Sequence, residues 1–265
     1  MVLFYTLPPE TIPYPFVIIN ANRPSVGMNY IVRNLRHVRS VIIDSGVEIF
    51  RDPRTKEYPG GPRRWIRNLV ALYRKVRGVV RGEVLVTCPD YPDDYHPKSL
   101  WIDERTTNIE RTVSNVSICV TRYTDVEWLI PIQGWCRNPA GLLRCLDYYW
   151  EMGVLDRYRY LAIANLCVEP NVRVIHSSVL AVRRWLHEHG LLDDVMLHIF
   201  GLKIAALRRV SKLIHSFDSV AWTRPVNKKL LVRYRHSAKN AYQRTLFFCE
   251  YIRVLSRRHR VDIPV

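Results

Sequence analysis

Polar side chains that can do acid–base or nucleophilic chemistry follow short apolar runs at intervals along this 265-residue chain. Three of these residues are carboxylates, at Asp44, Asp90 and Asp218. A carboxylate can serve as nucleophile, general acid or general base, depending on its surroundings. After other apolar runs, the same position is taken by an amide side chain, a serine hydroxyl or a glycine. The full set is Asp44, Ser45, Gly46, Asp90, Gln133, Gly134, Asn165, Gly201 and Asp218.

Each of these residues also has a purely structural interpretation. Asp218 could cap a helix that starts at Ser219, and Asp44 could cap the turn that follows it. Gln133 could bond to nearby backbone, and residues 89–95 could be only a loop rich in proline and aspartate. The set as a whole favours chemistry, because several acids gathered on one rim are costly unless they are used.

The apolar runs before these residues are typical of buried parallel strands. Between several of them, apolar residues recur at three- and four-residue spacing, which predicts helices. Gly78, Gly153 and Gly190 lie where helix C-caps belong. The predicted strands are 2–7, 16–21, 40–45, 84–89, 128–133, 160–165, 195–200 and 215–220. The predicted helices are 65–78, 139–153, 174–190, 202–214 and 237–259.

Alternating strands and helices predict an α/β protein with a single (β/α)8 TIM barrel over residues 1–224. A basic arm and a C-terminal helix would follow at 225–265, on or beside the barrel. The carboxyl ends of the strands would then bring the polar residues to one rim. About eight residues separate the first two runs, too few for a crossover helix. Whether residues 2–7 form a barrel strand therefore stays open, with a hairpin or a position outside the barrel as the alternatives. A doubly wound open sheet is the alternative, although no G-x-G-x-x-G supports it.

The charge of the chain indicates a polyanionic partner. The formal net charge is +16, and it is concentrated in two segments. Residues 61–82 carry seven Lys or Arg and no acid, and residues 223–260 carry eleven against one acid. Basic charge gathered in this way favours nucleic acid. The alternative is a solvated surface in an arginine-rich protein, and a membrane surface is disfavoured because neither segment shows an amphipathic pattern with exposed Trp or Phe.

Other classes of protein are disfavoured by composition. No apolar run approaches the ~18 residues of a membrane span, and the N-terminus is broken by prolines and lacks the positive region of a signal peptide. A cytoplasmic protein is therefore expected. No C-x-x-C pair occurs among the six cysteines, which predicts buried free thiols and no metal site. These are Cys88, Cys119, Cys136, Cys145, Cys167 and Cys249.

The ordered segments resemble the tRNA-guanine transglycosylase superfamily, which includes queuine and archaeosine tRNA-ribosyltransferases and DNA 7-deazaguanine transglycosylases. Each match is short, but their order and spacing cover the chain from about residue 16 to 224. The resemblance implies a pentosyltransferase that exchanges guanine in tRNA or DNA for a 7-deazaguanine of the preQ0 type, without a cofactor. The matching segments are IIDSG (42–46), CPD (88–90), PIQG (131–134), LAIAN (161–165), HIFGLK (198–203) and FDSVAWTR (217–224).

The resemblance implies a role for each matched residue. Asp218 would attack C1′ of the target nucleoside, since a carboxylate can stabilise an oxocarbenium-like centre and then bond to it. Asp44 would carry protons for the leaving and incoming bases. Asp90 would accept from the N1–H and 2-amino edge of guanine, and Gln133 would donate to O6. The other substrate-binding residues would be Ser45, Gly46, Gly134, Asn165 and Gly201, with Phe200, Gly201 or Tyr91 against the face of the base.

The resemblance also implies partners. A base inside nucleic acid must be flipped out to reach such a pocket, and the two basic segments would hold the backbone. The free 7-deazaguanine base is the second substrate, and a homodimer is expected because members of the superfamily often dimerise. The expected phosphate contacts are Arg63, Arg64, Arg67, Lys228, Lys229, Arg233 and Arg235.

Departures from the superfamily leave part of the function open. Only Cys249 lies where the bacterial tRNA enzymes carry their zinc ligands, so no structural zinc is expected. The family's Gly-Gly-Phe-Gln is replaced by residues 46–49, and the glycine-rich end of the sixth strand is Ala164-Asn165. The archaeal enzymes carry additional C-terminal RNA-binding domains, whereas this sequence ends at Val265. DNA versus RNA stays open, as do hydrolysis without exchange and a silent barrel that only binds nucleic acid.

Overall fold

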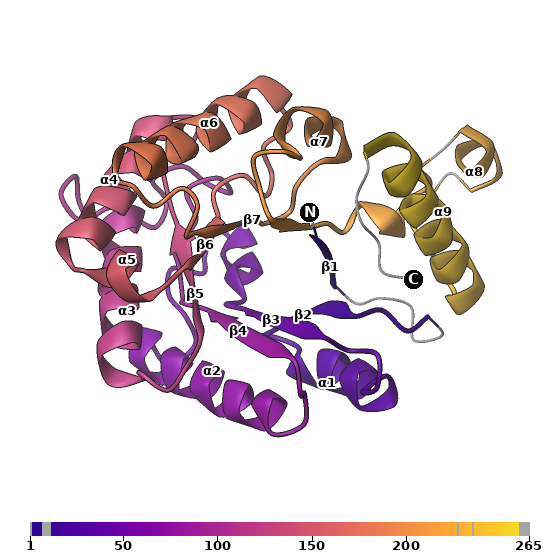
Figure 1. Cartoon of the computed structure of the whole chain (residues 1–265), viewed down its shortest axis with the longest axis horizontal. Coiled ribbons are helices and arrows are strands. Elements are labelled where there is room, and N and C mark those ends of the chain that lie inside the picture. Colours follow the sequence, from indigo (N-terminus) through magenta and orange to yellow (C-terminus); the bar gives the residue numbers. More distant parts are fainter. Residues whose placement is uncertain (1, 7–11, 227, 235, 260–265) are drawn as a thin grey trace.

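The computed structural model describes residues 2–6, 12–226, 228–234 and 236–259. In this part of the chain, eight parallel strands form a closed barrel in sequence order (Figure 1). The ring closes where β1 pairs with β8, with Phe4 opposite Asp218. The strands are β1 (Val2–Thr6), β2 (Phe16–Asn20), β3 (Ser40–Asp44), β4 (Glu83–Thr87), β5 (Trp128–Ile132), β6 (Tyr160–Ile163), β7 (Met196–Ile199) and β8 (Ser216–Asp218). All eight predicted strands are confirmed.

Alternation along the strands separates two hydrophobic clusters. In β3, Val41 and Ile43 belong to the large cluster between the barrel and its helices, whereas Ile42 belongs to a small cluster inside the barrel. Asp44 lies two positions after Ile42 in β3, and Asp218 lies two positions after Ser216 in β8, so each carboxylate is on the same side of its strand as that residue. Both carboxylates therefore lie at the top of the barrel interior. The inner cluster is Phe4, Ile18, Ile42, Leu85, Leu129 and Ala162.

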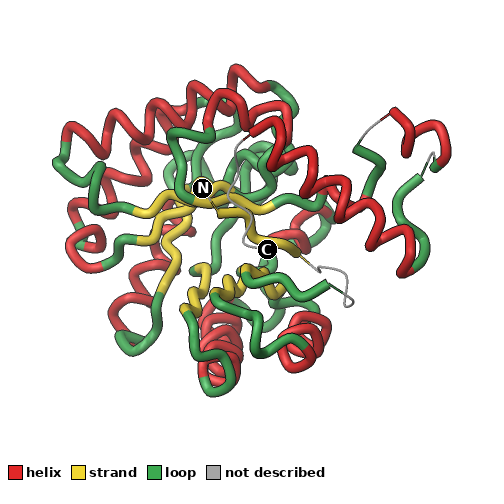
Figure 2. Tube along the Cα trace, turned by 45° about the vertical axis from the view of Figure 1, so that its right-hand side comes forward, coloured by secondary structure: helices red, strands yellow, loops and turns green. Residues whose placement is uncertain are grey.

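Helices surround the barrel (Figure 2). The spacing of apolar residues does not predict α1, α3, α5 or α8, although α3 is preceded by a capping box of Thr107 and Glu110 that is visible in the sequence. The predicted helix at 202–214 is shorter in the structure. The helices are α1 (Pro24–Arg33), α2 (Pro62–Arg77), α3 (Asn108–Arg122), α4 (Pro139–Glu151), α5 (Val154–Arg157), α6 (Val172–Glu188), α7 (Ile204–Val210), α8 (Lys228–Arg233) and α9 (Ala241–His259), with 3₁₀ turns η1 (Val47–Arg51) and η2 (Ala221–Thr223).

The first run joins the barrel, and it forms neither a hairpin nor a strand outside the ring. Strand β1 pairs in parallel with both β2 and β8, and residues 12–15 before β2 contain no helix. Helix α9 lies along the flank of the barrel, while α8 projects away from it (Figures 1 and 2). Phe248 of α9 packs edge-on against Tyr14 and Trp222, with ring centroids 5.9 and 5.6 Å apart. The C-terminal helix thus covers a flank that an early crossover helix would otherwise cover.

Other sequence predictions are partly confirmed. Gly153 and Gly190 follow α4 and α6 in the left-handed conformation, with φ of 65° and 68°, whereas Gly78 ends α2 in the right-handed region. All six cysteines are free, but only three are buried, and Cys249 is exposed. Among the described residues, no helix has the length and apolar character to cross a membrane.

Candidate active site

A cavity of about 220 Å³ opens at the carboxyl ends of the strands, and it brings together Asp44, Asp90 and Asp218. Asp44 ends β3, Asp90 lies in the loop after β4, and Asp218 ends β8. Its volume is below the ~300–1,000 Å³ of pockets for drug-sized ligands, and it suits a group the size of one nucleobase. The lining residues are Asn20, Asp44, Val47, Glu48, Arg51, Asp90, Tyr95, Ala164, Cys167, Phe200, Gly201, Asp218 and Val220.

Asp218 is the last residue of β8, and its carboxylate is anchored from the neighbouring strand. The backbone N–H of Gly201 donates to Oδ1 at 2.8 Å, and Nε2 of His198 lies 3.5 Å from the same oxygen. The helix-cap interpretation is wrong, because η2 begins only at Ala221 and takes Val220 as its N-cap. Asp218 therefore faces the cavity with one oxygen already held.

Asp44 ends β3 and lies in the same cavity. Its Oδ1 accepts a long hydrogen bond of 3.3 Å from the N–H of Gly46, so the turn-capping interpretation holds alongside the placement in the cavity. Burial raises the pKa of Asp44 well above its usual range, and the negative charges of Glu48, Asp90 and Asp218 raise it further. The arrangement suits a carboxyl group that keeps its proton and can donate it.

Asp90 is almost fully buried, with 2% of its surface exposed, and two side chains hold its carboxylate. Ser45 donates to Oδ1 at 2.7 Å, and the Gln133 amide donates to Oδ2 at 2.5 Å. Burial raises the pKa of Asp90 to about 6, while these hydrogen bonds oppose the rise. The Tyr58 hydroxyl fixes the backbone by donating to the Asp90 carbonyl oxygen at 2.8 Å.

Several predicted substrate-binding residues lie behind the cavity and do not line it. Ser45 and Gln133 hold Asp90, as described above. Gly46 adopts φ of 86°, and an added Cβ would meet the Asn22 side chain at 2.8 Å. At Gly134, an added Cβ would come within 2.8 Å of the Asn165 amide nitrogen. These residues support the cavity wall, and among the residues predicted to contact the base only Asp90, Phe200 and Gly201 line it.

Two tyrosines of the cavity region differ from the sequence prediction. Tyr91 does not line the cavity, because its hydroxyl donates to Glu57 at 2.5 Å and its ring lies under the Arg111 guanidinium. Tyr95 lines the cavity in its place, with the Arg51 guanidinium 5.3 Å above its ring. Arg51 was missed because it belongs to η1, whose five residues show no periodic pattern that would place them.

Comparisons with known proteins add little to this geometry. No protein-family model and no curated protein matches the chain. A solved structure described as "Native KDPGal structure" is 11% identical over 97% of each chain, with a TM-score of 0.40. The carboxyl transferase domain of Rhizobium etli pyruvate carboxylase is 11% identical, with a TM-score of 0.41, over 96% of this chain and 47% of that structure. Likenesses this low bear on neither reaction nor substrate, and the fold rests on the strand pairing itself.

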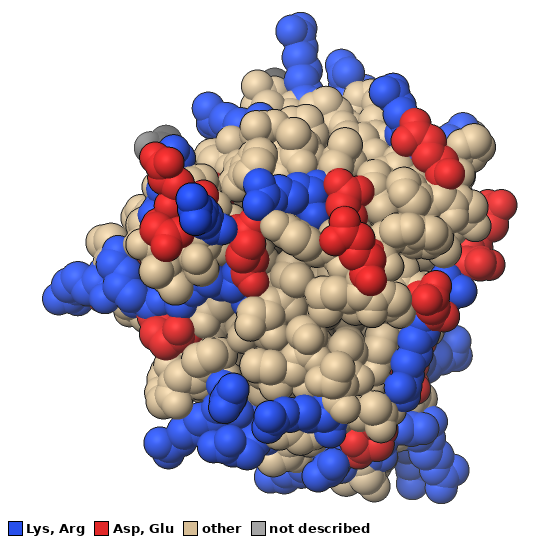
Figure 3. All heavy atoms as spheres, turned by 90° about the vertical axis from the view of Figure 1, so that its left-hand side faces the viewer, with Lys and Arg blue, Asp and Glu red and all other residues tan. Residues whose placement is uncertain are grey.

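The predicted phosphate-binding arginines of the first segment lie at the rim that carries the cavity. Arg63, Arg64 and Arg67 are exposed on the first turns of α2, which follows the carboxyl end of β3. The Trp65 indole donates to the carbonyl oxygen of Ser45 at 2.8 Å and so ties this end of α2 to the cavity wall. Figure 3 shows basic side chains along the lower edge of one face, at the height of α2 in Figure 1.

The second basic segment is described only in part. Lys229 and Arg233 are exposed on α8, away from the barrel (Figure 2). The side chain of Lys228 and the whole of Arg235 lie outside the described residues. In the described part of the chain, no group of three or more His, Cys, Asp or Glu side chains is placed to hold a metal ion.

A half-buried carboxylate, Asp94, makes stability depend on pH. Burial raises the pKa of Asp94 to about 6, although the Val168 N–H donates to its Oδ2 at 3.3 Å. Because the unfolded value is about 3.9, the folded state holds a proton that the unfolded state loses, and stability falls as pH rises from about 4 through 6. We expect Asp94→Asn to stabilise the protein by about 2 kcal/mol at pH 8 and by little at pH 4.

Urea unfolding at the two pH values measures this difference. The exposed Asp125→Asn serves as the control, since it removes the same charge from the surface. An equal gain for Asp94→Asn at both pH values would show that ionisation of Asp94 is not the cause.

Proposed function

We propose that this protein is a nucleic-acid guanine transglycosylase that exchanges guanine for a 7-deazaguanine base. The observation that carries the proposal is the meeting of Asp44, Asp90 and Asp218 in one cavity of nucleobase size at the carboxyl ends of the strands. The three carboxylates differ in their surroundings, and such differences allow acids of the same type to take different roles. The ordered motifs of the sequence supply the same three assignments.

In the proposed reaction, Asp218 attacks C1′ of the target nucleoside. The new bond joins a carboxylate oxygen to C1′, and the bond between C1′ and N9 of guanine breaks. Asp44 gives its proton to the departing guanine and becomes ionised. The ionised Asp44 then takes the N9 proton of the incoming 7-deazaguanine, whose N9 attacks C1′ and releases Asp218. Protons and charges balance over the cycle, so no cofactor takes part.

Recognition of the base is assigned to Asp90. Ser45 and Gln133 each occupy one of its oxygens with a single hydrogen bond, which leaves acceptor capacity for the N1–H and 2-amino groups of guanine. Phe200 and Gly201 provide an apolar wall next to Asp218. Gln133 lies behind the cavity and is fully buried, so its role in the free protein is to orient Asp90.

The proposal is tested by trapping the covalent intermediate. The full-length protein is incubated with guanine-containing single-stranded DNA or with tRNA, denatured, and examined for a protein–nucleic acid adduct. Without preQ0, release of labelled guanine should stop at about one equivalent per protein, matching the adduct, and repeated turnover should require added preQ0. Repeated turnover without preQ0, with abasic sites cleavable in base, would indicate a hydrolase. Tight binding with neither adduct nor release would indicate a silent barrel.

The rim arginines should set the salt dependence of nucleic-acid binding. We expect Arg63→Ala/Arg67→Ala to weaken binding and to reduce the slope of log K against log salt by about 1.4–1.8, since each phosphate contact contributes ~0.7–0.9. Fluorescence anisotropy with a labelled oligonucleotide between low and high salt measures the slope.

The same helix offers a matched control. Lys75→Ala/Arg81→Ala removes the same charge from exposed positions at the opposite end of α2 and just beyond it, so its slope should stay near that of the parent protein. Equal effects of the two double variants would mean that only net charge matters, and Arg63 and Arg67 would no longer be assigned to phosphate contacts.

A further inference from the structure

We propose that His198 is a positioning residue that holds the Asp218 carboxylate by donating its Nε2–H to Oδ1. The inference rests on the proposed function, in which Asp218 is the nucleophile. His198 belongs to β7 and is 2% exposed, inside the barrel and below the cavity. Nothing in the periodicity of its apolar run distinguishes it from a core residue.

The two ring nitrogens of His198 face different partners. Nδ1 lies 2.9 Å from the hydroxyl oxygen of Ser216, on the neighbouring strand β8. Nε2 lies 3.5 Å from Oδ1 of Asp218, and it is buried without a hydrogen-bond partner. A buried polar nitrogen left unpaired costs free energy, and hydrogen bonds of this kind are often long in a free enzyme and tighten in its complexes. Asp218 Oδ1, 3.5 Å away, is placed to accept a hydrogen bond from it.

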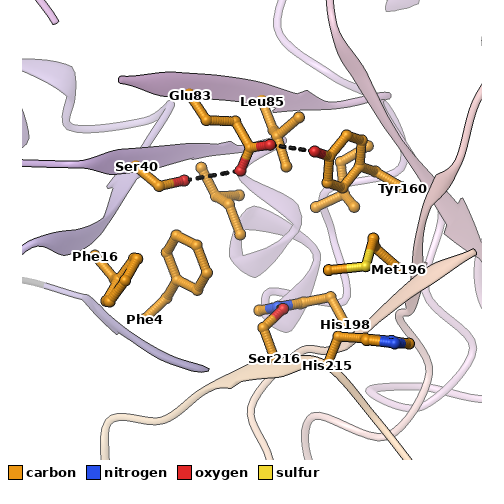
Figure 4. A pocket seen from close by; sticks show the side chains of 12 residues that line it. Phe4, Phe16, Ser40, Glu83, Leu85, Tyr160, Met196, His198, His215 and Ser216 are labelled. Carbon is orange, nitrogen blue, oxygen red and sulfur yellow. Dashed lines mark hydrogen bonds between the residues drawn. The ribbon is translucent and has the colours of Figure 1, made fainter. Parts of the chain in front are cut away.

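Packing fixes the plane of the imidazole ring. Phe4 and Phe200 contact it edge-on, with ring centroids 5.9 and 4.7 Å away. Figure 4 shows His198 beside Ser216 at the wall of a second cavity. With the ring held in place, the Ser216 hydroxyl can donate to Nδ1, and the proton of the neutral imidazole then resides on Nε2.

This arrangement makes the two oxygens of Asp218 unequal. Oδ1 is approached by two donors, the Gly201 N–H and the His198 Nε2–H. Oδ2 is thereby left for the bond to C1′. A nucleophile held within a narrow range of orientations gains rate from proximity, and a displacement of about 1 Å can cost 10²-fold.

The second cavity gives access to His198 from the other end of the barrel. It measures about 100 Å³ and is lined at the amino ends of the strands by Ser40, Glu83, Tyr160 and Met196 (Figure 4). Met196 is 45% exposed, so the cavity opens to solvent. Removal of the imidazole ring would therefore leave a space that a small ring can enter from outside.

Chemical rescue of His198→Ala tests the inference. We expect kcat for guanine release to fall on the order of 10- to 100-fold, with KM for the nucleic acid changed less than about twofold. Added imidazole should restore most of the lost kcat, whereas thiazole, which fills the same space without an N–H, should not. Unchanged kcat, or equal rescue by thiazole, would overturn the proposal.

A measurement that needs neither activity nor a variant of His198 separates this inference from the proposed function. In the full-length protein, ¹⁵N NMR should show the neutral His198 ring protonated at Nε2, and Asp218→Asn should shift that resonance. If the parent protein releases no guanine but the shift appears, the proposed function fails and the contact stands. If the ring is protonated at Nδ1, or Asp218→Asn leaves the resonance in place, the positioning role is wrong even when exchange is observed.

Discussion

Asp218→Asn should abolish adduct formation and lower the rate of guanine release by about 10⁴-fold or more, as expected when a nucleophile is removed. An amide has nearly the shape of a carboxylate, and its oxygen can still accept from the Gly201 N–H that now lies 2.8 Å from Oδ1. The local structure should therefore survive while the oxygen loses its charge and its capacity to bond to C1′. Denaturing gel electrophoresis of the adduct and release of labelled guanine measure the two effects.

Two controls make this result specific to Asp218. Asp125→Asn removes a carboxylate from an exposed pair with Arg74, and it should form adduct at the rate of the parent protein. Binding of the oligonucleotide by Asp218→Asn should stay within about threefold of the parent, since the phosphate contacts that dominate affinity are intact. A normal adduct in Asp218→Asn would mean that another side chain is the nucleophile.

Asp44→Asn should lower kcat by about 10²–10⁴-fold, the usual range for loss of a general acid or base. The structure gives a physical reason for assigning the acid to this residue. Burial and the charges of Glu48, Asp90 and Asp218 raise the pKa of Asp44, so the carboxyl keeps the proton that a departing guanine requires. Single-turnover release of labelled guanine isolates this step from binding and product release.

The pH profile provides the sharper test of the same assignment. The rate should rise with pH through about 6, because Asp90 must ionise to accept from guanine and its pKa is raised to about 6. It should fall again at higher pH, as Asp44 loses its proton at its raised pKa. Asp44→Asn should remove the alkaline fall and keep the rise near 6. An alkaline fall of the same size in Asp44→Asn would assign it to a different group.

The strands could be predicted from the sequence because buried parallel strands are continuous apolar runs, and β3 and β4 show this clearly. The place of β1 could not be predicted. Its pairing with β8 joins Phe4 to Asp218, which lie far apart in the sequence, and spacing along the sequence says nothing of such contacts. Helix α9 likewise covers its flank through tertiary packing of Phe248.

The same distinction holds for the candidate site: positions at strand ends could be predicted, and contacts between side chains could not. Asp44 and Asp218 could be predicted to meet because each ends a strand, and strand ends share one rim. The hydrogen bond that places Gln133 behind Asp90 depends on side-chain packing between two loops. His198 belongs to the matching segment 198–203, but a histidine among apolar residues is usually a satisfied core residue, and only its distance to Asp218 distinguishes it.

The pairing of Phe4 with Asp218 has a consequence for folding. Contacts between distant parts of a chain form slowly, because loop-closure entropy is lost before the contact stabilises the structure. Strand β8, which carries Asp218, is synthesised after the other seven strands, so β1 can pair with it only late in folding. Gly201 and His198 hold the Asp218 oxygen from the β7 side, and β1 supports β8 from its other side only once the ring has closed. A chain without β1 would keep every matched motif, yet we expect it to be catalytically inactive. In the intact chain, catalytic activity would then arise only when β1 pairs with β8, in the final step of folding.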